Sequence, residues 1–223
     1  MTYLLRVVLP DRPGTLGALA SALGSEGADI LSVDVVERAH GFAVDDLVVD
    51  LPSTRPPDVL ITAAESIREV SVESLRPFSG PLDTARELEL IEAVTAAPAD
   101  GPALLTEALP RIYRAAWALV VDGSDGGRPV RLAASAAAPE TEAEHLPWLP
   151  LARATVLETS TDRAVHEVPL AWSDLDTELA ASPLGAPARA VVVGRPGGPA
   201  FRPSELARMS HLCGILAVVM GMA

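Results

Sequence analysis

The 223-residue chain has no lysine, and this absence excludes several kinds of catalytic site. A P-loop, a pyridoxal phosphate Schiff base and a Ser-x-x-Lys hydrolase site each need the primary amine of a lysine. Arginine supplies all 17 Lys-plus-Arg residues, against 30 acidic residues, which gives a net charge of −13. Nucleic acids and anionic membranes are bound through clustered cations, so we expect neither as a partner.

Cysteine and long apolar segments are also scarce. Cys213 is the one cysteine of the sequence, so an internal disulfide or a cysteine zinc site cannot form, and a reducing compartment is expected. The longest apolar run, residues 212–223, is shorter than the ~20 residues that span a bilayer. The N-terminus lacks the basic-then-apolar pattern of a signal peptide. We therefore expect a cytoplasmic protein that does not bind membranes.

The composition favours folded domains, because 49% of the residues are hydrophobic. The length allows one large domain or two small ones. A proline-bearing stretch at residues 77–81 interrupts the pattern of helices and strands and is typical of a linker. We predict one domain at residues 1–76 and a second at residues 82–223.

The first of these domains shows the element order β-α-β-β-α-β. Apolar residues alternate in three segments and in a short fourth one, and they recur at helical spacing in two others. Thr15 is the expected N-cap of the first helix, and Pro57 opens the second. The predicted strands are residues 3–9 and 30–38, a third strand that follows the turn at His40-Gly41 and includes Leu47, Val49 and Leu51, and a short strand at residues 70–72.

Two helices can cover one face of such a four-stranded sheet. The opposite face mixes polar and apolar side chains, which favours contact with another subunit or domain, with a solvated face as the alternative. The residues expected on this face are Arg6, Ser32, Asp34, Leu4, Val8 and Val36.

The segment VVLPDRPGTLGALASALGSEGADILSVDV resembles the ACT domains that bind amino acids in metabolic regulators. The likeness covers residues 3–75 and rests on the turn Asp11-x-Pro13-Gly14-x-Leu16 between a strand and a helix. It implies a ferredoxin-like βαββαβ fold and the pairing of two domains.

The remainder of the chain predicts a second mixed domain. A glycine-rich hairpin separates two of its strands, residues 137–146 have a loop or weak-helix composition, and the chain closes with a long helix. The predicted helices are residues 82–97, 103–113, 173–181 and a helix from about residue 203, and the predicted strands are residues 115–121, 130–136, 165–170 and 190–193.

This second half resembles GAF domains, which are small-molecule sensory folds with a central antiparallel sheet flanked by helices. The resemblance rests on the helix-strand-hairpin-strand order and on Pro183-Leu184-Gly185 before the strand that leads to Phe201-Arg202-Pro203. Neither a bilin-attachment cysteine nor the Asn-Lys-x-Asp-Glu signature of the cyclic-nucleotide binders is present. The overall fold class is therefore expected to be α+β.

The candidate site is the turn at the start of the first helix. A helix N-terminus presents unpaired N–H groups and a partial positive charge, so it can accept a carboxylate. Gly14 lets a ligand approach the backbone, and Asp11 can take an ammonium group. The ACT resemblance adds the start of the second strand of a partner subunit. The candidate ligand-binding residues are Asp11, Arg12, Pro13, Gly14, Thr15, Leu16, Asp29, Ile30 and Leu31.

The same residues also have a purely structural interpretation. Pro13-Gly14 is needed for the turn in any case, and Asp11 can simply cap the helix. Asp11 and Asp29 stand where amino-acid-binding relatives usually carry asparagine. Aspartate only accepts hydrogen bonds, so the pair favours a cationic ligand or a lost site.

No nucleophile–base pair or metal-ligand spacing emerges, so we expect neither catalysis nor a metal or cofactor. The four histidines share no such spacing, and Trp117 is the expected liner of any pocket in the second domain. We therefore predict a non-enzymatic homodimeric sensor that binds a small molecule, an amino acid by resemblance, at an ACT interface and couples it to the GAF-like module. The alternative is a ligand-free dimerisation module; a hydrolase or transferase ranks third.

Overall fold

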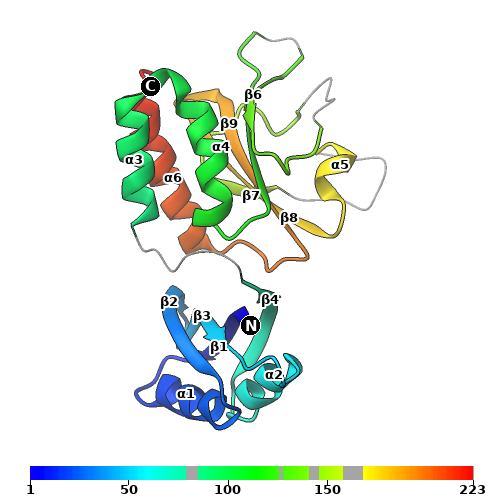
Figure 1. Cartoon of the computed structure of the whole chain (residues 1–223). Helices are drawn as coiled ribbons and strands as arrows, with labels where there is room; N and C mark the ends of the chain where they lie inside the picture. The colour runs from blue at the N-terminus through cyan, green and yellow to red at the C-terminus, as the bar shows by residue number, and fades with distance from the viewer. Residues whose placement is uncertain (79–84, 126–127, 141–145, 158–167, 223) are drawn as a thin grey trace. The chain divides into compact units, whose positions relative to one another are not determined.

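The computed structural model of the chain describes residues 1–78, 85–125, 128–140, 146–157 and 168–222. It divides into two compact units, Met1–Leu82 and Asp83–Ala223 (Figure 1). Of the predicted linker, Pro77 is the last residue of a strand, and the Phe78 amide donates a hydrogen bond to the Thr2 carbonyl (2.8 Å). Residues 79–81 lie outside the described residues. The exact domain boundaries stay a prediction.

The first unit has the predicted β-α-β-β-α-β order. All neighbouring strands are antiparallel, in the spatial order β2-β3-β1-β4. This arrangement confirms the ferredoxin-like fold that the ACT resemblance implied. Its elements are β1 (Thr2–Pro10), α1 (Thr15–Ser25), β2 (Asp29–Ala39), β3 (Phe42–Asp50), α2 (Asp58–Glu65) and β4 (Ser71–Pro77).

The core of this unit lies between the sheet and its two helices. Leu5 and Val7 on β1 are fully buried with Leu19 and Leu23 of α1 and with Leu60 of α2. These residues recur at a period of two on the strand and at a spacing of four on α1, so periodicity in the sequence was sufficient to place them.

The β2–β3 hairpin turns through His40 and Gly41, both with positive φ, as a two-residue hairpin loop requires. This tight turn fixes the register of β2 against β3.

On the sheet face away from these helices, Arg6 of β1 stands directly opposite Asp46 of β3. The guanidinium donates two hydrogen bonds to the carboxylate, Nε to Oδ1 at 2.7 Å and Nη2 to Oδ2 at 2.9 Å. Both side chains are buried, and the paired fork geometry satisfies both oxygens of the carboxylate. The prediction that Arg6 and Leu5 point to opposite faces is confirmed.

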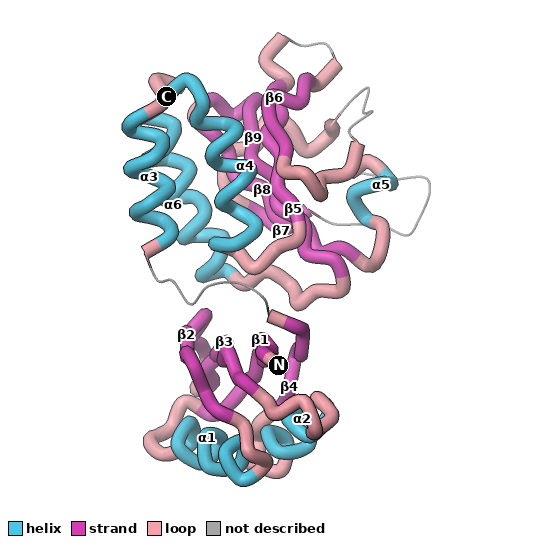
Figure 2. Tube along the Cα trace, in the orientation of Figure 1, coloured by secondary structure: helices cyan, strands magenta, loops and turns pink. Residues whose placement is uncertain are grey.

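The second unit is built on a five-stranded antiparallel sheet of order β6-β5-β9-β8-β7. Helices α3, α4 and α6 lie along one face of that sheet (Figures 1 and 2). This architecture is the helix-flanked antiparallel sheet that the GAF resemblance predicted. Its elements are α3 (Arg86–Ala96), the 3-10 turn η1 (Pro98–Asp100), α4 (Gly101–Ile112), β5 (Trp117–Asp122), β6 (Val130–Ala134), β7 (Thr155–Leu157), α5 (Leu170–Ser173), β8 (Thr177–Leu184), β9 (Ala186–Pro196) and α6 (Pro203–Val219).

Several predictions for this unit were wrong. Of the helix predicted at residues 173–181, residues 177–181 lie in strand β8, because tertiary pairing with β9 and β7 overrides the helix propensity of its alanines, leucine and glutamate. Residues 98–100 form a 3-10 turn, and Gly101 already begins α4 rather than preceding it. Strand β7 was not predicted.

Other predictions fall partly outside the described residues. Of the strand predicted at residues 165–170, Leu170 belongs to α5 and Val168 is buried in the core, while residues 165–167 lie outside the described part. Residues 137–140 form no helix, and 141–145 are not described. The C-terminal helix begins at Pro203, as predicted.

Candidate functional site

The turn between β1 and α1 is held by its own backbone. The Asp11 amide donates to the Gly41 carbonyl at 2.9 Å, and the Arg12 amide donates to the Pro10 carbonyl at 2.8 Å. Gly14 has φ 93° and ψ −18°, a left-handed conformation that glycine adopts without strain. It occupies the N-cap position of α1, so the prediction that Thr15 is the N-cap was wrong: Thr15 is the first helical residue.

The N-terminus of α1 is uncapped by any side chain. Asp11 therefore does not cap the helix, which removes one of the structural interpretations of this residue. The first turn closes through the Ala18 amide on the Gly14 carbonyl at 2.9 Å, and within the described part of the chain the amides of Leu16 and Gly17 have no acceptor. These two donors sit at the positive end of the helix dipole, where an anion is stabilised.

The space around the Cβ positions of Gly14 and Gly17 is open. A Cβ built on Gly14 or on Gly17 would meet no atom within 4 Å. Leu16 between them is 38% exposed. A small ligand can therefore reach the backbone at this turn.

The charged side chains of the turn contact other exposed side chains. Arg38 Nε lies 3.7 Å from Asp11 Oδ1, and Arg12 Nη2 lies 2.6 Å from Glu69 Oε2. The positive charge of Arg12 is thus balanced by Glu69. A ligand carboxylate at the turn would depend on the α1 amides rather than on the Arg12 guanidinium.

Sequence analysis missed Asp45 of β3. It lies on the sheet face that the helices cover. It is 3% exposed, and its Oδ1 atom has no hydrogen-bond partner. Burial raises the pKa of Asp45; Arg38 opposes that rise, whereas the negative charges of Asp11 and Asp46 add to it. One signal was available in the sequence: Asp45 occupies the apolar phase of its strand, in line with Ala43 and Leu47.

Asp29, Ile30 and Leu31 lie far from the turn within one chain. Asp29 pairs with Asp50 at one end of the sheet, whereas the turn follows Pro10, whose partner Phe42 is at the other end. The nine residues of β1 make these ends about 27 Å apart. One chain therefore does not bring the two parts of the predicted site together.

Strand β2, which carries these three residues, is an edge strand with exposed apolar side chains. Leu31 is 41% exposed, Val33 38% and Val35 51%. An exposed edge strand of eleven residues is a template for pairing with another strand.

In the second unit, three tryptophans gather on the sheet face opposite α3, α4 and α6. The ring centroids of Trp117 and Trp172 are 6.2 Å apart, and those of Trp148 and Trp172 are 6.4 Å apart. Trp117 lies directly on the backbone of Gly194, where a Cβ would come within 2.1 Å of the indole. Trp117, predicted to line a pocket, is thus 5% exposed in this cluster.

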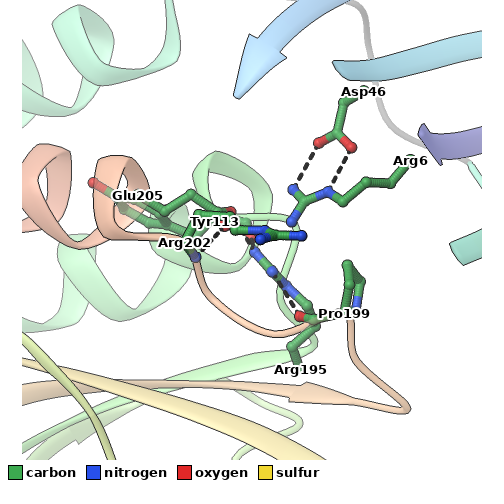
Figure 3. A network of polar contacts seen from close by, with 7 residues as sticks. All are labelled: Arg6, Asp46, Tyr113, Arg195, Pro199, Arg202 and Glu205. Carbon is green, nitrogen blue, oxygen red and sulfur yellow. Dashed lines mark hydrogen bonds and ion pairs between the residues drawn. The ribbon is translucent and has the colours of Figure 1, made fainter. Parts of the chain in front are cut away.

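A buried arginine joins β9 to the start of α6 in the same unit (Figure 3). Arg195 Nη2 donates to Glu205 Oε1 at 2.8 Å and to the Tyr113 carbonyl at 2.6 Å, and its Nη1 donates to the Pro199 carbonyl at 2.9 Å. The Arg202 amide donates to the second Glu205 oxygen at 2.9 Å. Both oxygens of this buried carboxylate are therefore satisfied.

No arrangement suited to a metal emerges: the described ranges hold no group of three or more His, Cys, Asp or Glu residues that could bind one. Burial raises the pKa of Cys213 to about 12, with a smaller opposing effect of the Ser182 hydroxyl, so this thiol stays protonated at neutral pH. Among the described residues, no helix is both long and apolar enough to cross a bilayer.

Comparison with known proteins identifies the first unit. The family model of the ACT domain matches residues 3–69. No curated protein matches the chain at a significant level.

Three solved structures are similar to parts of the chain. The GAF domain of a phosphoenolpyruvate-protein phosphotransferase from Acinetobacter aligns with a TM-score of 0.49 and 10% identity, over 64% of this chain and 95% of that one. A formyltetrahydrofolate deformylase from Pseudomonas putida KT2440 gives 0.28 and 13%, over 43% and 38%. An unknown protein from Galdieria sulphuraria gives 0.33 and 14%, over 99% and 91%.

Because these sequence identities and TM-scores are low, the three structures support no statement about the function or the site of this chain. The family match, the β2-β3-β1-β4 sheet and the topology of the second unit carry the assignment. Residues 3–69 of this chain are an ACT domain, and an α+β domain with a GAF-like, helix-flanked antiparallel sheet follows it.

Proposed function

We propose that this protein is a non-enzymatic regulator whose ACT domain binds an amino acid between two copies of the chain. The observation that supports the proposal is the N-terminus of α1, where the Leu16 and Gly17 amides lack acceptors among the described residues and a Cβ at Gly14 or Gly17 would meet no atom within 4 Å. A ligand carboxylate would accept hydrogen bonds from these amides. Asp29, Ile30 and Leu31 of a second copy would complete the site.

The exposed β2 edge supports the pairing of two copies that the site needs. A ligand held between two subunits favours the arrangement in which both parts of the site meet. Occupancy would then change the affinity for a downstream partner, and the partner would change ligand affinity by the same factor. The GAF-like domain is the proposed receiver of this signal, and the cytoplasm is its proposed location.

The test is a thermal melt by circular dichroism with each of the twenty L-amino acids in turn. A ligand at about 100 times its Kd adds about 2.7 kcal/mol of stability. We expect a shift with at least one amino acid at millimolar concentration. Absence of any shift would remove amino-acid sensing as the function.

Gly17 offers a sharper variant than Gly14, because Gly17 has ordinary helical geometry and Gly14 does not. Gly17→Leu would fill the open space over the amides without straining the helix, and we expect it to abolish the ligand shift. Gly24→Leu is the matched control, since Gly24 is also exposed on α1 with open space around it. If both variants retain the shift, the ligand binds elsewhere.

The second candidate function is a ligand-free dimerisation module, which the apolar β2 edge favours. It predicts that Gly17→Leu leaves the oligomeric state unchanged in analytical ultracentrifugation, whereas Val33→Arg on the edge strand yields monomers. Under the sensor proposal, dimer stability also rises when the amino acid is added.

A further inference from the structure

Asp45 is a buried carboxylate for which the ACT domain provides no partner. Its residue is 97% buried, Oδ1 has no hydrogen-bond donor, and no ion pair reaches it among the described residues. Leaving a buried polar group unpaired is costly. The neighbouring Asp46, on the other face of the same strand, has both oxygens bonded to Arg6. The fold therefore can satisfy a buried aspartate and does not do so at Asp45.

Asp45 lies on the sheet face that α1 covers, towards the end of the sheet where the β1–α1 turn begins. It pairs with Val7 of β1, and Val7 packs in the core between the sheet and the helices, so Asp45 points to the same side as α1. It is three residues from Phe42, at the sheet end from which the β1–α1 turn emerges. Asp11 in that turn is near enough for its charge to act on Asp45.

Solvent reaches this region from the side of β2. Val35 pairs directly with Asp45 on the same face and is 51% exposed. At the start of α1, a Cβ on Gly14 or Gly17 would meet no atom within 4 Å. The open end of α1 thus has hydrogen-bond donors on the helix and a carboxylate on the sheet below.

We propose that Asp45 receives the ammonium group of the ACT ligand, so that the site binds α-amino acids in preference to 2-oxo acids with the same side chain. This inference rests on the proposed function. The ligand carboxylate would accept from the Leu16 and Gly17 amides, and its ammonium would donate to Asp45. A 2-oxo acid satisfies only the first of these requirements and brings its negative charge close to a buried carboxylate that stays unpaired.

The composition of the chain supports a carboxylate in this role. The sequence contains no asparagine and no glutamine, so no side-chain amide can bind both ends of a zwitterion. Arg12, the one cation of the turn itself, is paired with Glu69. The charged groups that act on Asp45 are Arg38, Asp11 and Asp46, a net negative set that favours a cationic ligand group.

The experiment compares matched ligand pairs on the intact chain by isothermal titration calorimetry. The probes are L-leucine against 4-methyl-2-oxopentanoate, L-valine against 3-methyl-2-oxobutanoate, L-phenylalanine against phenylpyruvate, and for any other amino acid that shifts the melt, its own 2-oxo acid. A hydrogen bond to a charged group corresponds to roughly a 10- to 150-fold change in affinity. We expect the wild-type chain to prefer the amino acid by a factor in that range.

Asp45→Asn tests the residue itself. The amide oxygen of the variant can still accept a hydrogen bond but carries no charge, so we expect weaker binding of the amino acid and a smaller preference over the 2-oxo acid. Asp58→Asn, an exposed aspartate at the start of α2, is the control and should bind like the wild type.

The outcomes separate the two proposals. Equal binding of amino acid and 2-oxo acid by the wild type, or full affinity in Asp45→Asn, overturns the role of Asp45 and leaves amino-acid sensing intact. Failure of the wild type to bind any amino acid overturns both. The wild-type ligand pairs decide the question even if the variant does not fold.

Discussion

Each unit of the molecule buries a carboxylate, and the two are treated in opposite ways. In the second unit, Glu205 is bonded through one oxygen to Arg195 and through the other to the Arg202 amide. In the ACT domain, Asp45 is still more buried, and its Oδ1 atom has no hydrogen-bond partner among the described residues. Glu205 joins a strand to a helix, so its role is complete within the chain. Asp45 is a cost to the fold, which is the condition expected of a residue whose partner arrives from outside.

The largest effect on stability is expected when the ion pair of Glu205 is removed. Glu205→Gln removes the charge that pairs with fully buried Arg195, and losing one member of a buried ion pair costs about 3–5 kcal/mol. All three tryptophans lie beyond residue 82, so tryptophan fluorescence in a denaturant titration reports the second unit.

Exposed Glu107 of α4 provides the control, and Glu107→Gln should leave the transition where it is. If Glu205→Gln also shifts it by less than about 1 kcal/mol, the buried pair is not what holds α6 to the sheet.

The next largest effect is a gain in stability rather than a loss. Asp45→Asn should stabilise the ligand-free chain at neutral pH, because the amide removes the negative charge that burial disfavours. Because the folded-state pKa of Asp45 is raised, the wild-type chain carries no penalty below the ordinary value of 3.8. The penalty grows as the pH rises through the folded-state pKa. Urea titrations followed by circular dichroism at several pH values measure the difference.

Asp46→Asn is the matched neighbour and should destabilise the chain, because it removes the buried ion pair between Arg6 and Asp46. Two variants of equal chemistry at adjacent positions would then move stability in opposite directions. A loss of stability in both would contradict the contrast between a satisfied and an unsatisfied aspartate.

The smallest effect concerns Asp122, a half-buried carboxylate that accepts hydrogen bonds from Ser124 and Arg189. Burial acts to raise the pKa of Asp122, but hydrogen bonds from Ser124 and from Arg189 (Nε to Oδ2, 2.8 Å) outweigh it and lower the pKa. Asp122→Asn should cost about 1–2 kcal/mol at neutral pH. Since the folded-state pKa is lowered, this contribution is present above 3.8 and is lost as the pH falls through the folded-state value.

Tryptophan fluorescence again follows the transition, with exposed Asp125 of the same hairpin as the control position. A loss that persists unchanged in acid would mean that packing, not charge, is responsible.

Prediction succeeded where local pattern and packing agree. In the ACT domain, Leu5, Val7, Leu19 and Leu23 fall on one face by periodicity, and the structure buries all four. The turn at Gly14 was also predicted, because its glycine and proline limit the backbone to few conformations.

Prediction failed where a distant segment decides the conformation. Residues 173–181 have the composition of a helix, yet β8 forms because β9 and β7 offer strand partners on both sides. Asp45 was passed over for a related reason: its sequence neighbours indicate only a strand, and neither its burial nor its lack of a partner is visible until α1 is packed over the sheet.

The amino-acid sequence by itself determined the two-part organisation, the order of elements in the ACT domain and the open turn at Gly14, since each follows from short-range periodicity and backbone preference. Only the tertiary structure decided which carboxylates are satisfied and that the two halves of the predicted site lie at opposite ends of one sheet. Burial and pairing depend on segments that are distant along the chain, and no local pattern encodes them.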